Sequence, residues 1–253
     1  MRVFRTIDQL LRGRHTGPQE GGIEVRADTL LLAIAILGVA YGAFMGLYAA
    51  LRGGSNAALQ MVASMAKVPL LFLLTLVVTF PSLYVFSALA RSRLTFEATL
   101  RLLLGAMTVN MALLASFGPV TGFFTLSTES YPFVVILNVA FFAISGLIGL
   151  SFLRTSLTGV FEADSVLPRA AWQVPTAPQT EAPRNPPEAK ARAGGAAKDV
   201  FRLWTVIYAV VGAQMGWILR PFVGDPHRPF QLFRERQGNF FIAVLEVLES
   251  LFR

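Results

Sequence analysis

The sequence predicts an all-α integral membrane protein, a polytopic bundle of about five transmembrane helices with an amphipathic helix at each end. Three observations predict this fold class. Of the 253 residues, 54% are hydrophobic and only 15% are charged, whereas a soluble domain carries roughly 25% charged residues. Four apolar stretches are long enough to cross about 30 Å of hydrocarbon and contain no charged residue. Arginine or lysine residues flank these stretches, so lipid is the expected solvent of the chain.

The four stretches predict a four-helix transmembrane region over residues 29–154, with spans at 29–51, 68–90, 102–126 and 131–153. A fifth span is expected within 201–219, where the apolar run Leu203–Leu219 has Trp204 and Trp217 near its ends. Tryptophan is enriched at the two membrane–water interfaces, which favours a crossing helix here. A span this short is accommodated by local thinning of the bilayer.

The distribution of positive charge predicts a cytoplasmic N-terminus. Fifteen of the 22 lysines and arginines lie in the N-terminal tail, in 91–101 and in 154–202, which five spans place on one side. Cytoplasmic segments carry such an excess. The C-terminal tail then lies outside, although it contains five arginines. We expect a bacterial cell inner membrane as the location.

The segments outside the spans are expected to be interfacial or disordered. Residues 1–28 are predicted to form a cytoplasmic amphipathic tail that lies on an anionic membrane surface or packs on the protein's own loops. Residues 155–200 are predicted to be a disordered linker, because proline and alanine are frequent and a core cannot form. Within 220–253 we expect a hairpin rich in arginine and phenylalanine, followed by an amphipathic helix at the outer interface or against a partner.

The hairpin combines three prolines and a glycine with four arginines at the expected edge of the bilayer. Guanidinium groups bind phosphate or carboxylate oxygens in bidentate geometry. The segment is therefore a candidate contact site for anionic lipid head groups or for a protein partner, or else an ordered turn that only anchors the fifth span. The candidate residues are Trp217, Arg220, Phe222, Arg228, Phe230, Phe233, Arg234 and Arg236.

Small and polar residues inside the spans predict helix contacts. Glycines at four-residue spacing permit close approach of two helices, and they occur as two sets, Gly38, Gly42 and Gly46, and Gly212 and Gly216. They indicate either a homo-oligomer interface or packing within one chain. The embedded amides are Asn110, Asn138 and Gln214, which should bond across helices or line a wet path.

Several classes of function are excluded or disfavoured by what the chain lacks. There is no cysteine and there are only two histidines, so a cysteine-ligated or multi-histidine metal site is excluded, and no cofactor is expected. No motif of a known catalytic site occurs, so an enzyme is not expected. No charged residue lies inside the predicted spans, which disfavours an ion-coupled transporter. The net charge of +7 is explained by loop orientation and anionic lipid, without nucleic acid.

Three stretches carry a resemblance to a known family. They are Tyr41-Gly42 in the first span, Ala66-Lys67-Val68-Pro69-Leu70-Leu71 before and into the second, and Leu94-Thr95-Phe96-Glu97-Ala98-Thr99-Leu100-Arg101 before the third. With these stretches the chain resembles bacterial members of the Yip family of five-span membrane proteins. The resemblance covers residues 29–154 and implies a compact helical bundle without catalytic activity. The chain departs from this pattern at 165–198 and in the hairpin after the fifth span.

Two functions follow from these features. The first is a non-enzymatic scaffold or accessory subunit that contacts protein partners, a second copy of the chain or anionic lipids through its terminal segments. The second is a small transporter, channel or permease subunit with a polar path lined by Asn110, Asn138 and Gln214.

Topology mapping tests the predicted number of spans. A reporter enzyme that is active only outside the cytoplasm, fused after Arg253, should be active, and the same reporter before Met1 should be inactive. A fluorescent protein that folds only in the cytoplasm should give the opposite pattern. If the C-terminal fusion reports the cytoplasm, the fifth span does not cross.

Overall fold

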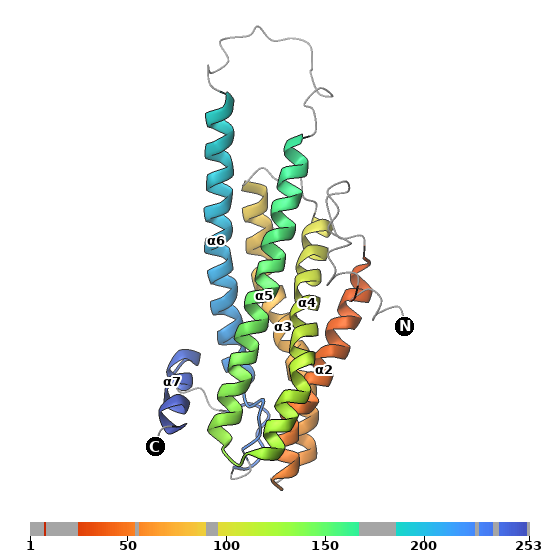
Figure 1. The fold of residues 1–253 in the computed structure, drawn as a ribbon, viewed down its shortest axis with the longest axis vertical. Coiled ribbons are helices and arrows are strands. Elements are labelled where there is room, and N and C mark those ends of the chain that lie inside the picture. The colour runs from red at the N-terminus through yellow and green to blue at the C-terminus, as the bar shows by residue number, and fades with distance from the viewer. Residues whose placement is uncertain are drawn as a thin grey trace.

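In the computed structural model, residues 8, 25–53, 56–89, 96–166, 186–225, 228–234 and 238–251 are described. All regular secondary structure in this part of the chain is helical (Figure 1). The helices are α2 (Ala27–Leu51), α3 (Ala57–Leu89), α4 (Phe96–Ser127), α5 (Tyr131–Val166), α6 (Pro186–Leu219) and α7 (Phe240–Leu251). The predicted N-terminal tail, apart from Asp8 and residues 25–28, lies outside the described residues.

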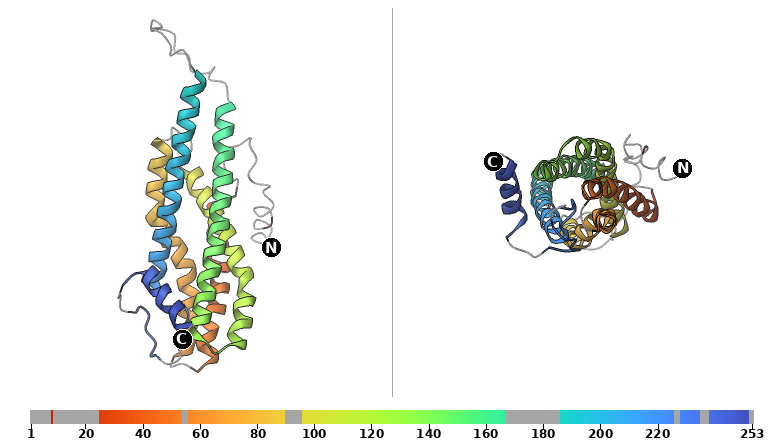
Figure 2. Two further views of the ribbon diagram at one scale, coloured as in Figure 1. Left: turned by 60° about the vertical axis from the view of Figure 1, so that its left-hand side comes forward. Right: turned by 90° about the horizontal axis from the view of Figure 1, so that it is seen from below.

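The long helices form a bundle in which successive helices run in opposite directions (Figures 1 and 2). Helix α2 packs against both α3 and α4, α4 packs against α5, and α6 packs mainly against α3. The short helix α7 contacts α5 and α6 near the end of the bundle where α6 terminates. The turns after α2 and α4 lie at this same end, so the C-terminal segment meets the beginnings of α3 and α5 there.

Four helices are long and apolar enough to cross a membrane, namely Ala27–Leu51, Ala57–Val85, Phe96–Ser127 and Tyr131–Ser156. Large apolar side chains such as Val77, Leu126 and Leu147 are exposed on the outside of the bundle. Exposed apolar side chains along several helices are what lipid solvation of a bundle requires. The predicted class, an all-helical integral membrane protein, is therefore supported. In α6 the apolar part, Leu203–Leu219, is shorter than these four.

The second helix begins earlier than predicted. The sequence predicts a span at 68–90 with Lys67 as its flanking charge, but α3 begins at Ala57 and its candidate membrane span is Ala57–Val85. Lys67 therefore lies inside the helix, and its side chain is buried. The prediction was wrong here because a charged residue ends a span only if it has to reach water; Lys67 has protein partners, described below.

The predicted linker is also partly helical. Helix α5 continues to Val166 and α6 begins at Pro186, so helix occupies both ends of the segment 155–200 that we expected to be disordered. Alanine favours helix strongly, and proline is tolerated in the first helical turn. Residues 167–185 lie outside the described residues. Helix α4 likewise begins at Phe96, before the predicted start at 102, and Glu97 pairs with Arg101 one turn later.

The glycines of α2 pack against the backbone of α3. A Cβ atom at Gly42 would lie 2.5 Å from the Ser64 carbonyl oxygen, and one at Gly46 would lie 2.7 Å from the Met61 Cα. At Gly38 the nearest atom would be the Pro69 Cβ, at 3.0 Å. Of the two interpretations of this glycine stripe, packing within one chain is the one that the structure supports. The same holds for Gly212 and Gly216, which face Thr75 and Leu71 of α3 at ordinary contact distances.

The glycine contact between α2 and α3 gives a stability test. Gly42→Ala should lower the free energy of unfolding by about 1–3 kcal/mol, because the added methyl group overlaps backbone that cannot rotate away. The measurement is the midpoint of thermal unfolding in mild detergent. Gly212→Ala is the matched control, since its Cβ would lie 3.6 Å from the Thr75 Cγ2. An equal midpoint for the two variants would contradict the packing described here.

Candidate functional site

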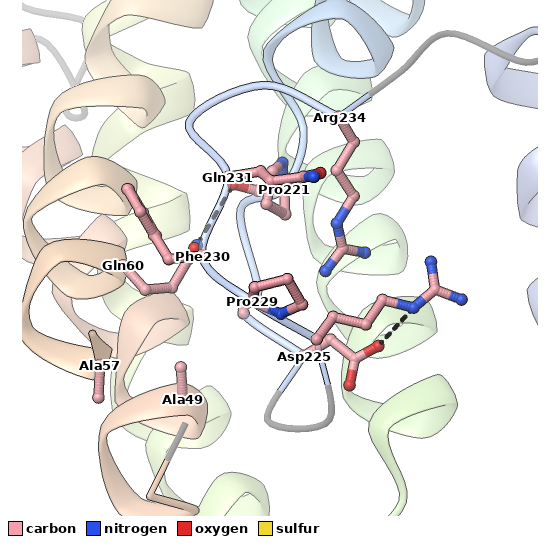
Figure 3. Close-up of a pocket in the computed structure, with 11 residues that line it drawn as sticks. Ala49, Ala57, Gln60, Pro221, Asp225, Pro229, Phe230, Gln231 and Arg234 are labelled. Atoms are coloured by element: carbon pink, nitrogen blue, oxygen red, sulfur yellow. Dashed lines mark hydrogen bonds and ion pairs between the residues drawn. The ribbon is translucent and has the colours of Figure 1, made fainter. Parts of the chain in front are cut away.

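The segment after α6 folds back onto the end of the bundle. Helix α6 ends at Leu219, and Pro221, which has no backbone N–H to continue a helix, follows after one residue. The chain then runs as an irregular loop against α3, described over residues 220–225 and 228–234 and called loop 220–234 below (Figure 3). Pro221, Val223 and Gly224 are buried. The arginine–phenylalanine hairpin is therefore part of the bundle and not an appendage.

A polar stripe on α3 holds this loop. Gln60, Ser64 and Lys67 follow one another at intervals of four and three residues, which places them on one face of the helix. Gln60 Nε2 donates to the carbonyl oxygens of Pro221 and Phe222, each at 3.4 Å. Ser64 Oγ lies within hydrogen-bonding distance of the Phe222 oxygen. Lys67 Nζ donates to the Pro221 oxygen at 3.0 Å and to the Leu232 oxygen.

The hydrogen bonds of the stripe supply donors to backbone carbonyl groups of the loop. Carbonyl groups of an irregular segment have no helix partner, and at the end of a lipid-solvated bundle water cannot be relied on to supply one. Three donors from one helix face meet three of these carbonyls. The Lys67 side chain is in turn removed from water, at 3% exposure. Its ammonium group also lies 5.3 Å from the centre of the Phe233 ring, a favourable cation–π position.

Further contacts fix the loop from the α5 side and from within. The Tyr131 hydroxyl donates to the Val223 oxygen at 3.3 Å. The Arg234 amide donates to the Arg220 oxygen at 3.3 Å, which closes the loop on itself. A Cβ atom at Gly224 would lie 2.4 Å from the Gln60 Cγ and 2.7 Å from the Ala49 Cβ. Only glycine therefore fits between the loop and the ends of α2 and α3.

A small hollow lies between the loop and helices α2 and α3. Its volume is about 10 Å³, roughly the space of one water molecule. Asp225 and Arg234 stand on one side of it and Gln60 on the other (Figure 3), and Arg228 also lines it. Asp225 pairs with Arg228 at 3.4 Å, and the Arg228 side chain is 68% exposed. The loop thus presents positive charge outward at this end of the bundle.

The predicted contact residues divide into an inner and an outer set. Phe222 points inward, with its ring 6.4 Å from that of Phe142, and Phe230 lines the small hollow. The Arg220 guanidinium lies 3.3 Å from the centre of the Trp217 ring. Partial burial, together with the charge of Arg234, lowers the pKa of Arg220 from its ordinary value.

The outer set contains the residues that can meet another molecule. Arg228 and Phe233 are exposed, and Arg234 is half-buried at the surface of the loop. Arg236 lies outside the described residues. Within the predicted hairpin, lipid or partner contacts are therefore available to Arg228, Phe233 and Arg234 among the residues that the structure describes.

The three embedded amides do not share a cavity in the described part of the chain. Asn138 is satisfied within the bundle, since its Oδ1 accepts a hydrogen bond from the Tyr41 hydroxyl at 2.7 Å and its Nδ2 donates to the Val134 oxygen at 2.8 Å. Asn110 lines a separate small cavity between α4, α5 and α6, and Gln214 is half-buried on α6. The polar path that a transporter would need is not formed by these three side chains in this structure.

The polar stripe was missed at the sequence level, although a signal for it was present. Gln60, Ser64 and Lys67 are the polar residues of an otherwise apolar stretch, and their spacing matches one helix face. The prediction of a span at 68–90 leaves this stretch outside the membrane. The predicted spans themselves contain no charged residue, but the longer candidate span Ala57–Val85 includes Lys67.

The chain was compared with protein-family models, with curated proteins and with solved structures, and none of the three comparisons found a match. Within the described residues, no three side chains of histidine, cysteine, aspartate or glutamate are grouped so that they could hold a metal ion.

The bond from Lys67 to the loop can be tested with a substitution of similar length. Lys67→Met should release the loop, because the Pro221 and Leu232 oxygens lose their donor, at a cost of about 1–3 kcal/mol for each buried acceptor left unpaired. Limited trypsin digestion should then cleave faster after Arg234. Arg26→Met, at an exposed site, is the control and should digest like the unaltered protein. Unchanged cleavage of the Lys67→Met protein would contradict the anchoring role.

Proposed function

We propose that this chain is a non-enzymatic integral membrane protein that acts as a scaffold or accessory subunit. In this proposal α6 is the fifth span, and a protein partner binds the C-terminal unit, which we define as loop 220–234 together with α7. Exposed arginines of the loop contact anionic lipid head groups beside that partner. The Yip-like character of residues 29–154 belongs to the same proposal, since that resemblance implies a bundle without catalytic activity.

The observation that carries the proposal is the uncovered apolar edge of α7. Phe240, Ala243, Val244 and Val247 are half-buried where the helix meets the bundle, whereas Phe241, Leu245 and Leu248 are exposed. On a helical wheel the exposed set lies directly beside the half-buried set, so the bundle covers only part of the apolar face. Glu246 and Glu249 lie on the remaining side, together with the exposed Ile242. An apolar edge with an acidic flank, presented from a fixed base, suits contact with a second protein helix.

The contacts that fix loop 220–234 support a role for α7 in binding a partner. A binding surface loses less entropy on association when its base is already ordered. Loop 220–234 connects α7 to the bundle and is fixed by the polar stripe of α3 and by Tyr131. Lys67 and Asn138 are hydrogen-bonded within the bundle, and Asn110 lines a cavity that neither of them reaches. This arrangement favours a packed scaffold over a conducting subunit.

Site-specific photocrosslinking in the native membrane tests the proposal. A photoreactive amino acid at Leu245 of the full-length chain should give a discrete protein adduct that mass spectrometry can identify, because this side chain is 59% exposed on the proposed contact edge. The matched control is Leu147, which is 67% exposed on α5 and should give only lipid adducts. Adducts with a second copy of the chain would identify a homo-oligomer. Lipid adducts alone at Leu245 would overturn the proposed partner contact.

A further inference from the structure

Asn110 of α4 is a buried polar residue that lies apart from the C-terminal unit. Its side chain is 5% exposed and lies in the middle of a candidate span. Its Oδ1 atom is fully buried and accepts no hydrogen bond from any described residue. An unpaired buried acceptor is costly, and the surrounding lipid offers no donor. Among the described residues, no protein group satisfies this acceptor.

Asn110 lies at a small cavity between α4, α5 and α6. The cavity volume is about 10 Å³, which matches roughly one water molecule. Most of the wall consists of apolar side chains and glycines, and the polar side chains among the described residues that line it are Asn110 and Tyr208. Tyr208 comes from α6, and within the described part of the chain no hydrogen bond is recorded for its hydroxyl. Polar residues from two different helices therefore line the same small space.

Two glycines of α5 create this space. A Cβ atom at Gly149 would lie 3.0 Å from the Asn110 Cβ, so glycine allows the amide to lie flat against α5. At Gly146 an added Cβ would meet no atom within 4 Å, which shows open room beside the amide. The cavity is thus a consequence of small residues placed opposite Asn110. An apolar cavity of this size would stay dry, but a cavity with two polar groups can hold water.

We propose that this cavity is a resident water site within the membrane-spanning bundle. One water molecule donates a hydrogen bond to Asn110 Oδ1 and bonds to the Tyr208 hydroxyl, which can donate or accept. The bridge joins α6 to α4, whereas the direct packing of α6 is mainly with α3. The site takes one small molecule with at least one hydrogen-bond donor, and the volume selects water over a larger hydroxyl compound. This inference does not depend on the proposed scaffold function.

A double-mutant cycle on the purified full-length protein tests the bridge. Asn110→Leu and Tyr208→Phe each remove one partner of the water without a large change in shape. Each should lower the midpoint of thermal unfolding, and the double variant should be no lower than the worse single variant, because the second change removes a partner of a water already lost. Asn138→Leu is the control, since its amide bonds directly to Tyr41. Its effect should add to that of Tyr208→Phe.

A structure at a resolution that shows ordered water provides the direct readout. A single isolated density peak within hydrogen-bonding distance of both Asn110 Oδ1 and the Tyr208 hydroxyl would support the proposal. An empty cavity would overturn it, and so would an elongated density that continues into the lipid. Additive effects of Asn110→Leu and Tyr208→Phe would also overturn the bridge, whatever the density shows.

Discussion

The arrangement of the C-terminal part depends on one constraint: an irregular peptide segment that is buried against the bundle must find its hydrogen-bond donors within the protein. Helix α3 supplies them from Gln60, Ser64 and Lys67 on a single face. The ammonium group is the strongest of these donors and, once buried, is itself costly unless it is bonded. The loop and the lysine therefore stabilise each other, and neither arrangement is favourable without the other.

The glycine contacts follow from the same close packing. Gly42 lets α2 approach the backbone of α3 at the carbonyl of Ser64, a residue of the polar stripe. Gly224 of the loop fits against Ala49 and Gln60 at the ends of these two helices. Helices α2 and α3 together thus form the base on which residues 220–234 rest. Helix α7, in turn, packs against α5 and α6.

Sequence reasoning was sufficient where solvation by lipid decides the outcome. The long apolar stretches predicted the membrane helices, and their termini at Leu51, Ser127 and Tyr131 lie at or next to the predicted boundaries. It failed where a charged or polar group finds a partner far along the chain. Lys67 bonds to residues more than 150 positions away, and no local pattern indicates such a partner. The helical ends of the proline- and alanine-rich segment were missed because composition alone does not show where helix propagation stops.

The sequence predicted which segment forms the candidate site, but not how the side chains of that segment are arranged. Prolines, arginines and phenylalanines marked 217–236 as unusual, and most of these residues do lie in one compact loop. These residues divide into an inner set, with Phe222 against Phe142, and an outer set, with Arg228 exposed. The division depends on the contacts that the loop makes with α3 and α5. That information belongs to tertiary packing, in the same way as the hydrogen bond between Tyr41 and Asn138.

The sequence distance between Lys67 and its partners bears on how the protein is made. While the ribosome is still adding the later helices, the carbonyls of Pro221 and Leu232 do not yet exist, and the lysine of the second described helix has to remain hydrated. The hydrogen bonds that hold Lys67 can therefore form only after the last segment of the chain has been made. A chain that ended before residue 220 would lack both of these acceptors.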